Sequence, residues 1–190
     1  MKKLKYILLL LIVFNAFSYA EKIFSLDITW SLLKPADTSY QKIYTDKPLY
    51  PEIILAYKFK NDFFVYSGFG FLKEEGEVDT LDYKVKSDQN YISFGLGYEF
   101  MSKKRINFRL SGGIIFVNYE GIAYFDDNLT GMDKGNRTGY KFDIGFYYKL
   151  TKTYVLNFIA GYFHGQNTTD YSRKLSYGGL KIGAGIGLRF

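Results

Sequence analysis

The sequence contains no cysteine and only three prolines among its 190 residues. The missing cysteine excludes two kinds of exported protein, a small disulfide-stabilised domain and a lipoprotein anchored through a cysteine. No continuous apolar run after residue 20 is long enough to form a membrane-spanning helix. If the rest of the chain enters a membrane, it must therefore do so as a closed β-barrel, in which every backbone hydrogen bond is satisfied.

The chain also has little excess charge. It carries 25 basic and 19 acidic residues, and three of the basic residues are Lys2, Lys3 and Lys5. Without those three, 22 basic residues face 19 acidic ones, a net charge of +3. This excess is too small to indicate nucleic-acid binding, so no nucleic-acid partner is expected.

The first twenty residues have the pattern of a secretory signal peptide. The three lysines precede an apolar core at 6–14, and Ser18 and Ala20 place small residues before a cleavage point. We expect cleavage before Glu21, which leaves 21–190 as a single domain.

The clearest structural signal is strict alternation at the end of the chain. Apolar residues occupy every second position from Leu180 to Phe190, and the positions between them are Lys181, Gly183, Gly185, Gly187 and Arg189. A period of two predicts a β-strand with one apolar face. Glycines on the other face would leave room for side chains inside a narrow barrel, so Gly185→Ser is expected to cost far less stability than Ile186→Arg on the apolar face.

Seven further segments alternate in the same way. Each predicted strand has about 9–12 residues, enough to span a bilayer at a tilt near 45°. Long and short connections alternate between them, as in transmembrane barrels with short periplasmic turns and long outer loops. The strands are 21–32, 49–59, 63–71, 92–100, 106–116, 140–150, 154–164 and 180–190; the long connections are 34–48, 73–90, 120–139 and 165–177; the short turns are 60–62, 102–105 and 151–153.

Aromatic residues gather at both ends of these strands, as in the two girdles of membrane barrels. Phe59, Phe63, Phe100, Tyr148, Tyr154 and Phe190 fall at the short-turn ends, and Trp30, Phe116, Tyr140 and Tyr162 at the long-loop ends.

The strand count, the alternation, the N-terminal segment and the terminal Phe190 together resemble the small eight-stranded outer-membrane barrels of the OmpA and OmpX type. The resemblance implies an all-β, antiparallel up-and-down transmembrane barrel in the outer membrane of a Gram-negative cell. It also implies a monomer inserted by the barrel-assembly machinery, in contact with outer-membrane lipid and lipopolysaccharide and with an unidentified surface ligand or host partner. The main soluble alternative is a lipocalin-like barrel with its apolar faces turned inward, which the glycine-rich faces and aromatic ends disfavour.

Fold alone does not fix the activity, because such barrels include structural proteins, adhesion proteins, narrow pores and a few lipid-modifying enzymes. We expect a structural or surface-interaction role through four long extracellular loops, without enzymatic activity or a cofactor. The alternatives are a lipid A-modifying enzyme that uses His164 and a narrow gated pore.

Ten charged residues fall on the predicted inward face. Charges in a narrow lumen should pair or meet water, because isolated buried charges are costly. Arg109 is expected near Asp27 or Glu99. The charges would form a polar plug or, alternatively, a gate that opens by exchanging ion-pair partners. The ten are Asp27, Glu52, Lys58, Glu99, Arg109, Lys141, Asp143, Lys149, Lys181 and Arg189.

Three other stretches invite a chemical interpretation. His164 is the only histidine, and 164–167 loosely resembles the motif of outer-membrane lipid A deacylases, with Gln166 where those enzymes have serine; Ser172 or Ser176 could substitute only if the loop folds back. Residues 126–131 match the opening of a calcium-binding loop, but its twelfth position is Arg137 rather than glutamate. The charge run at 73–88 could bind divalent cations that bridge lipopolysaccharide. None is strong enough to predict a catalytic, cofactor-binding or metal-binding residue.

Overall fold

The computed structural model describes residues 24–37, 41, 43–44, 47–59, 61–78, 83–125, 128–166 and 177–190. The predicted signal peptide at 1–20 lies outside these residues. In the part of the chain that the structure describes, no helix is long and apolar enough to cross a membrane.

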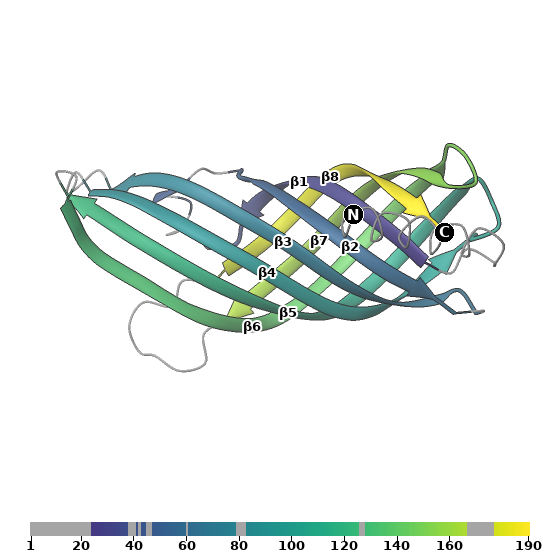
Figure 1. Cartoon of the computed structure of the whole chain (residues 1–190), viewed down its shortest axis with the longest axis horizontal. Helices are drawn as coiled ribbons and strands as arrows, with labels where there is room; N and C mark the ends of the chain where they lie inside the picture. The colour runs from purple at the N-terminus through teal and green to yellow at the C-terminus, as the bar shows by residue number, and fades with distance from the viewer. Residues whose placement is uncertain are drawn as a thin grey trace, which may run out of the picture.

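Eight antiparallel strands form one closed barrel, which confirms the predicted fold class (Figure 1). The first and last strands close the sheet, with Ser25 opposite Arg189 at one end of the ladder and Pro35 opposite Gly179 at the other. In the closed part of the ladder every strand is paired on both sides, which is the condition for a β-structure to span a bilayer. The strands are β1 (Phe24–Pro35), β2 (Leu49–Lys58), β3 (Phe63–Val78), β4 (Tyr83–Phe100), β5 (Ile106–Phe125), β6 (Asn128–Lys149), β7 (Tyr154–Gln166) and β8 (Tyr177–Arg189).

The outer surface of the barrel is apolar. Ile182 is 71 % exposed, Leu96 66 % and Ile144 61 %, and the alternate positions on each strand point into the lumen. The predicted faces are confirmed, even on β3, where both faces are apolar and where Phe69 and Phe71 point outward and Tyr66 inward. An apolar surface of this extent is incompatible with water and suits hydrocarbon, so the lipocalin-like alternative is wrong.

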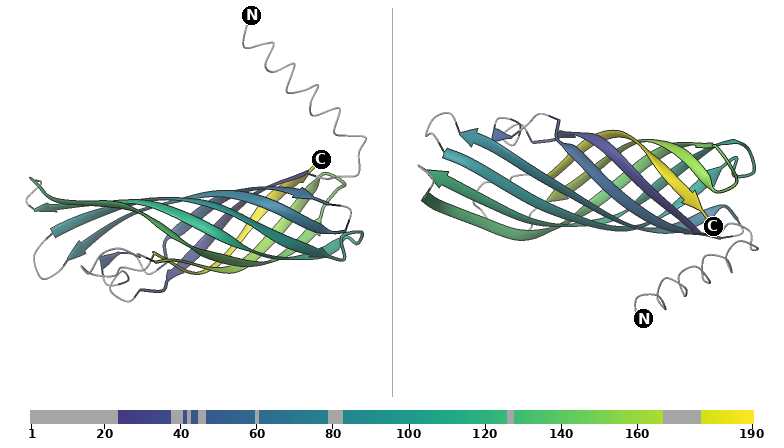
Figure 2. Two further views of the ribbon diagram at one scale, coloured as in Figure 1. Left: turned by 90° about the horizontal axis from the view of Figure 1, so that it is seen from below. Right: turned by 45° about the horizontal axis from the view of Figure 1, so that its top comes forward.

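The two ends of the barrel differ. One end, here called the turn end, carries the start of β1, the end of β8 and the short connections at 59–62, 101–105 and 150–153. Asp62 and Met101 adopt positive φ there (64° and 56°), as tight reversals require. At the other end, here called the extended end, β3 to β6 project well beyond the other four strands (Figures 1 and 2).

This extension corrects two of the predicted long loops. The stretches 73–90 and 120–139 are mostly strand, because β3 and β4 pair as far as Val78 and Tyr83, and β5 and β6 as far as Phe125 and Asn128. The four strands consequently have 16 to 22 residues, rather than the predicted 9–12. In the added parts of these strands most outward side chains are polar, so the sequence loses the apolar contrast that marks a strand, while the backbone pairing continues.

The close packing of β8 against β1 corrects a second expectation. A Cβ atom on Gly185 would lie 2.8 Å from the Cα of Thr29 and still closer to the carbonyl oxygen of Ile28. Both contacts are with backbone, which cannot turn aside as a side chain can. Gly185→Ser should therefore be costly, contrary to the expectation from the sequence.

Candidate functional site

The half of the lumen nearer the extended end, here called the upper half, holds a buried cluster of two cations and two carboxylates. Lys181 lies 2.7 Å from Glu52 and 3.1 Å from Asp143, while Lys141 lies 3.2 Å from Asp143 and also pairs with Glu52. The four side chains come from β2, β6 and β8 and are at most 7 % exposed. Each charge therefore faces opposite charges, which offsets the desolvation cost of burying it. We call these four residues the upper quartet.

A second neutral cluster lies nearer the turn end. Arg109 approaches Glu99 at 2.9 Å and Asp27 at 3.3 Å, and Arg189 approaches Asp27 at 2.8 Å. This confirms the predicted neighbourhood of Arg109 and adds Arg189 to it. Both guanidinium groups also lie over the ring of Tyr147, at 4.7 and 5.2 Å from its centroid. We call Asp27, Glu99, Arg109 and Arg189 the lower quartet.

Apolar layers separate and cover the quartets. Ile54, Ala56, Phe64, Tyr66 and Ile159 form a buried cluster, and the lumen beside it holds a cavity of only about 20 Å³. Toward the extended end, the rings of Tyr50 and Tyr91 meet at 5.2 Å, and the ring of Phe163 lies 5.3 and 5.1 Å from them. These three rings belong to a larger buried cluster, here called the aromatic plug: Leu33, Tyr50, Leu72, Tyr91, Ile115, Val117, Tyr119, Phe163 and Tyr177.

The aromatic plug was not predicted from the sequence. Tyr50, Tyr91 and Phe163 occupy inward positions of their strands, which is the one signal in the sequence that points to the aromatic plug. With two neutral quartets and two apolar layers stacked along the axis, the described side chains fill the lumen from the lower quartet to the aromatic plug. This packing favours the predicted polar plug over an open channel.

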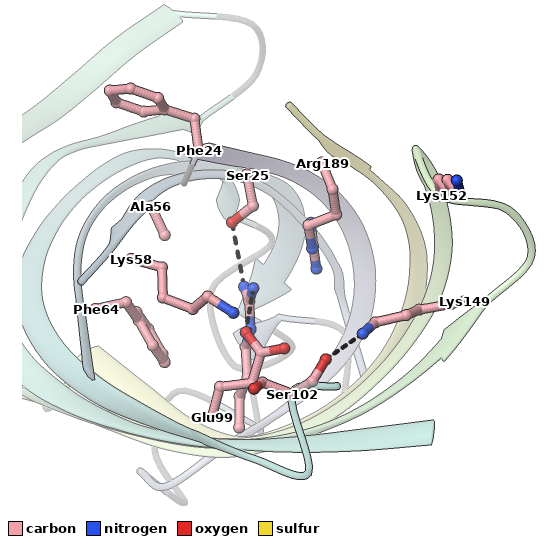
Figure 3. Close-up of a pocket in the computed structure, with 11 residues that line it drawn as sticks. Phe24, Ser25, Ala56, Lys58, Phe64, Glu99, Ser102, Lys149, Lys152 and Arg189 are labelled. Atoms are coloured by element: carbon pink, nitrogen blue, oxygen red, sulfur yellow. Dashed lines mark hydrogen bonds and ion pairs between the residues drawn. The ribbon is translucent and has the colours of Figure 1, made fainter. Parts of the chain in front are cut away.

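Below the lower quartet the lumen opens into a cavity of about 290 Å³ at the turn end, here called the vestibule (Figure 3). Lys58 and Lys149, both predicted to point inward, extend into it from β2 and β6. The ammonium group of Lys149 donates a hydrogen bond to the backbone carbonyl of Ser102. Lys58 lies 3.6 Å from Asp62 at the rim. All ten charged residues predicted to face inward therefore do so.

His164 lies on the outward face of β7, near the extended end. Its ring stacks on Tyr162 with a centroid distance of 6.4 Å and lies 5.7 Å from the ring of Tyr140. Histidine and both tyrosines thus form part of the outer aromatic girdle, away from the charges of the lumen. The two serines considered as nucleophiles, Ser172 and Ser176, lie outside the described residues.

The calcium-loop hypothesis is wrong. Asp126 and Asp127 lie outside the described residues, but the rest of the candidate loop, from Asn128 to Arg137, is extended strand paired with β5. A calcium loop must curl around its ion, which a paired strand cannot do. Arg137 instead donates a 2.6 Å hydrogen bond to the hydroxyl group of Tyr119 and lies over its ring.

The charge run at 73–88 forms cross-strand ion pairs where it is described. Lys73 lies 3.4 Å from Asp88, and Lys86 lies 2.7 Å from Glu75, which lowers the pKa of that carboxyl group. Among the described residues, no group of three acidic or histidine side chains gathers at a point where it could hold a metal ion. The structure therefore gives the cation-bridging hypothesis no support in the described part of the run.

No family model and no curated protein matches the sequence. Solved structures do match. The outer membrane protein OprG of Pseudomonas aeruginosa has a TM-score of 0.62 at 16 % identity, over 88 % of this chain and 95 % of that one. Each of two others, Neisserial surface protein A and the attachment invasion locus protein Ail of Yersinia pestis, has a TM-score of 0.55 at 16 % identity, over 88 % of this chain and 97 % of its own.

The chain has the fold of the small eight-stranded outer-membrane barrels. Identities this low establish the fold alone. None of the three names describes an enzyme, and Ail has also been solved in complex with the heparin analogue sucrose octasulfate.

Proposed function

We propose that this protein is an integral β-barrel of the bacterial outer membrane, with a closed lumen and a structural or surface-interaction role. The observation that carries the proposal is the combination of an apolar outer wall with a lumen filled by two neutral charge quartets and an aromatic plug. Such a barrel is anchored in lipid, and its lumen is closed along the stretch that the two quartets and the aromatic plug occupy. The free surfaces are those that project from the membrane.

The proposed orientation places the turn end in the periplasm and the extended end outside the cell. Short periplasmic turns and long outer segments are the rule in such barrels. Residues 1–20 would direct export and be removed, and the barrel-assembly machinery would insert the chain as a monomer, with Phe190 as part of its recognition signal. The backbone of Phe190 pairs with that of Phe24 at 2.8 and 3.0 Å, so the end of the chain completes the closing ladder.

The surface most suited to an interaction lies on β4, β5 and β6, just beyond the apolar band. Asn90, Asn118 and Asn136 are exposed and lie opposite one another on neighbouring strands, one step outward from Ile92 and Phe116. The next row outward contains Asp88, Glu120 and Lys134, and the two rows line a common groove. Amide groups hydrogen-bond sugar hydroxyls in two directions, and an ammonium group pairs with phosphate. The amide row fits the sugar hydroxyls of lipopolysaccharide, and Lys134 offers one contact to a phosphate beside the two carboxylates.

The test compares lipopolysaccharide binding by the full-length protein in phospholipid nanodiscs with binding by a variant in which the three asparagines are alanine. We expect the affinity to fall about tenfold, equivalent to roughly 1.4 kcal/mol. Asn61→Ala, on an exposed turn at the opposite end, is the matched control and should bind as the wild type does. Equal affinity of the wild type and the triple variant would contradict this surface assignment.

The alternative of an enzyme acting on lipid A through His164 is tested separately, by mass spectrometry of lipid A from cells with and without the gene. The proposal predicts the same acyl pattern in both. A change in acyl pattern that depends on His164 would replace the structural proposal with an enzymatic one.

A further inference from the structure

The vestibule at the turn end combines a cavity, an excess of cations and an apolar wall. Its volume of about 290 Å³ is close to the lower limit of small-molecule sites, roughly 300 Å³. Arg109 and Glu99, which approach each other at 2.9 Å, both line it. Lys58 and Lys149 extend into it, and the ring of Phe64 forms part of one wall (Figure 3). The ring of Phe24 is at the rim and points away from the cavity.

The cations around the vestibule outnumber the carboxylates. Five of its eleven lining side chains are cationic and only Glu99 is acidic. The two arginines are matched by Glu99 and Asp27 within the lower quartet. The exposed turns at the same end add Lys103, Lys104 and Arg105. Over the described residues of this end, eight cationic side chains face three carboxylate side chains, those of Asp27, Asp62 and Glu99.

Two ammonium groups in the vestibule, those of Lys58 and Lys149, can still pair with an added anion. Lys149 donates to a neutral backbone carbonyl, that of Ser102, and forms no ion pair with any residue that the structure describes. The ammonium group of Lys58 lies 3.6 Å from the carboxylate of Asp62, which is beyond ordinary hydrogen-bond distance. Both groups are partly screened from water by the barrel wall, so their attraction for an anion exceeds that of a fully exposed lysine. Arg109 and Arg189, which also line the vestibule, belong to the lower quartet and are held in place by its carboxylates.

We propose that the vestibule binds a small organic anion, a carboxylate or phosphate carried on a compact apolar body. The anionic group would lie between the ammonium groups of Lys58 and Lys149, and the apolar body against Phe64 and Ala56. Charge alone would hold any anion weakly, whereas the apolar wall selects anions with a nonpolar part. The anion could be a free solute of the compartment facing the turn end or the headgroup of a neighbouring phospholipid, since both present the same chemistry.

The experiment uses the full-length protein in nanodiscs of zwitterionic phosphatidylcholine, with phenyl phosphate as the probe. Binding is followed by saturation-transfer NMR and calorimetry, with phenol and inorganic phosphate as reference ligands. We expect phenyl phosphate to bind at least tenfold more tightly than either reference, because each of them lacks one half of the recognised structure. Equal binding of phenol, or of inorganic phosphate, would overturn the proposal.

The variants are Lys58→Met and Lys149→Met, singly and together, which keep the length of the side chain and remove its charge. Each should weaken phenyl phosphate binding several-fold, and the pair at least tenfold. Lys103→Met, on an exposed turn outside the cavity, is the control for general electrostatic attraction and should bind as the wild type does. Heat-modifiable gel mobility verifies that each variant is folded. An unchanged affinity in a folded double variant would contradict the proposal.

Repeating the titration in discs that contain phosphatidylglycerol separates the two sources of the anion. If a lipid headgroup occupies the site, phenyl phosphate binding weakens in these discs for the wild type and the Lys103→Met control alike. If the site takes a soluble anion, its affinity is the same in both kinds of disc. Both outcomes support an anion site, and they identify where its ligand comes from.

Discussion

Lys181 on β8 and Glu52 on β2 meet at 2.7 Å inside the barrel, although 129 positions separate them in the sequence. Their strands are not hydrogen-bonded neighbours, because β1 lies between them. The pair therefore bridges part of the lumen and couples the closing strand to the second strand. Since the same ammonium group also reaches Asp143 on β6, this contact holds three strands at a fixed spacing.

The stability of an Arg109→Leu variant shows whether the lower quartet is truly buried. Arg109→Leu would leave Glu99 without its cation and Asp27 with Arg189 alone, and stranding a buried partner costs about 3–5 kcal/mol. The measurement is urea-induced unfolding in lipid vesicles, followed by tryptophan fluorescence. Arg105→Leu makes the same change on an exposed turn and should alter stability by no more than about 1 kcal/mol. A loss well under 1 kcal/mol for Arg109→Leu would mean that water fills this part of the lumen.

The stability of an Ile186→Arg variant shows whether this side chain faces lipid near the middle of the membrane. Ile186 is 56 % exposed and lies opposite Ile28, in the middle of the outward row on β1. Ile186→Arg would place a charge near the middle of the hydrocarbon layer, at a cost of about 2–4 kcal/mol. Leu49→Arg lies at the extended end of β2, where the cost should fall to roughly 0–1 kcal/mol. Equal stability of the two variants, measured by the same unfolding assay, would show that depth is assigned wrongly.

The orientation can be tested because the natural chain has no cysteine. Single cysteines are introduced as Lys134→Cys, on the outward face of the extension, and Lys103→Cys, on a short turn. A membrane-impermeant maleimide added to intact cells should label position 134 at once. It should label position 103 only after the outer membrane is permeabilised. Labelling of position 103 in intact cells would reverse the proposed orientation.

The end of the chain should govern assembly rather than export. Deleting Phe190 removes the two backbone hydrogen bonds that it forms with Phe24 and the proposed recognition signal. We expect signal cleavage to proceed, while the heat-modifiable fraction in the outer membrane falls. Phe190→Tyr retains the backbone and an aromatic ring and serves as the control. Full assembly of the deletion variant would show that Phe190 is dispensable.

The sequence predicts the barrel well because the membrane imposes a sharp contrast at each strand. Within the bilayer an outward residue such as Ile186 must be apolar and an inward one such as Lys181 need not be, so alternation identifies both the strand and its face. Beyond the bilayer this contrast ends. Lys73 and Asp88 face each other on paired strands, yet in the sequence they look like parts of a charged loop.

The partners inside the lumen are only partly predictable. Arg109, Glu99 and Asp27 could be brought together because strand direction gives their depth. The contact of Lys181 with Glu52 and the stacking of Tyr50, Tyr91 and Phe163 depend on the stagger of the strands and on side-chain rotamers, which alternation does not encode. The clash expected at Gly185 depends in the same way on the approach of two backbones.

The central claim is that the lumen is closed, and single-channel recording of the folded wild-type protein in planar lipid bilayers tests it most directly. The two quartets and the aromatic plug fill the path, so protein with the heat-modifiable mobility of the folded barrel should insert without discrete conductance steps. Insertion is verified by protease protection of the reconstituted barrel. Regular, long-lived conductance steps from the same preparation would contradict the claim and identify the protein as a narrow pore.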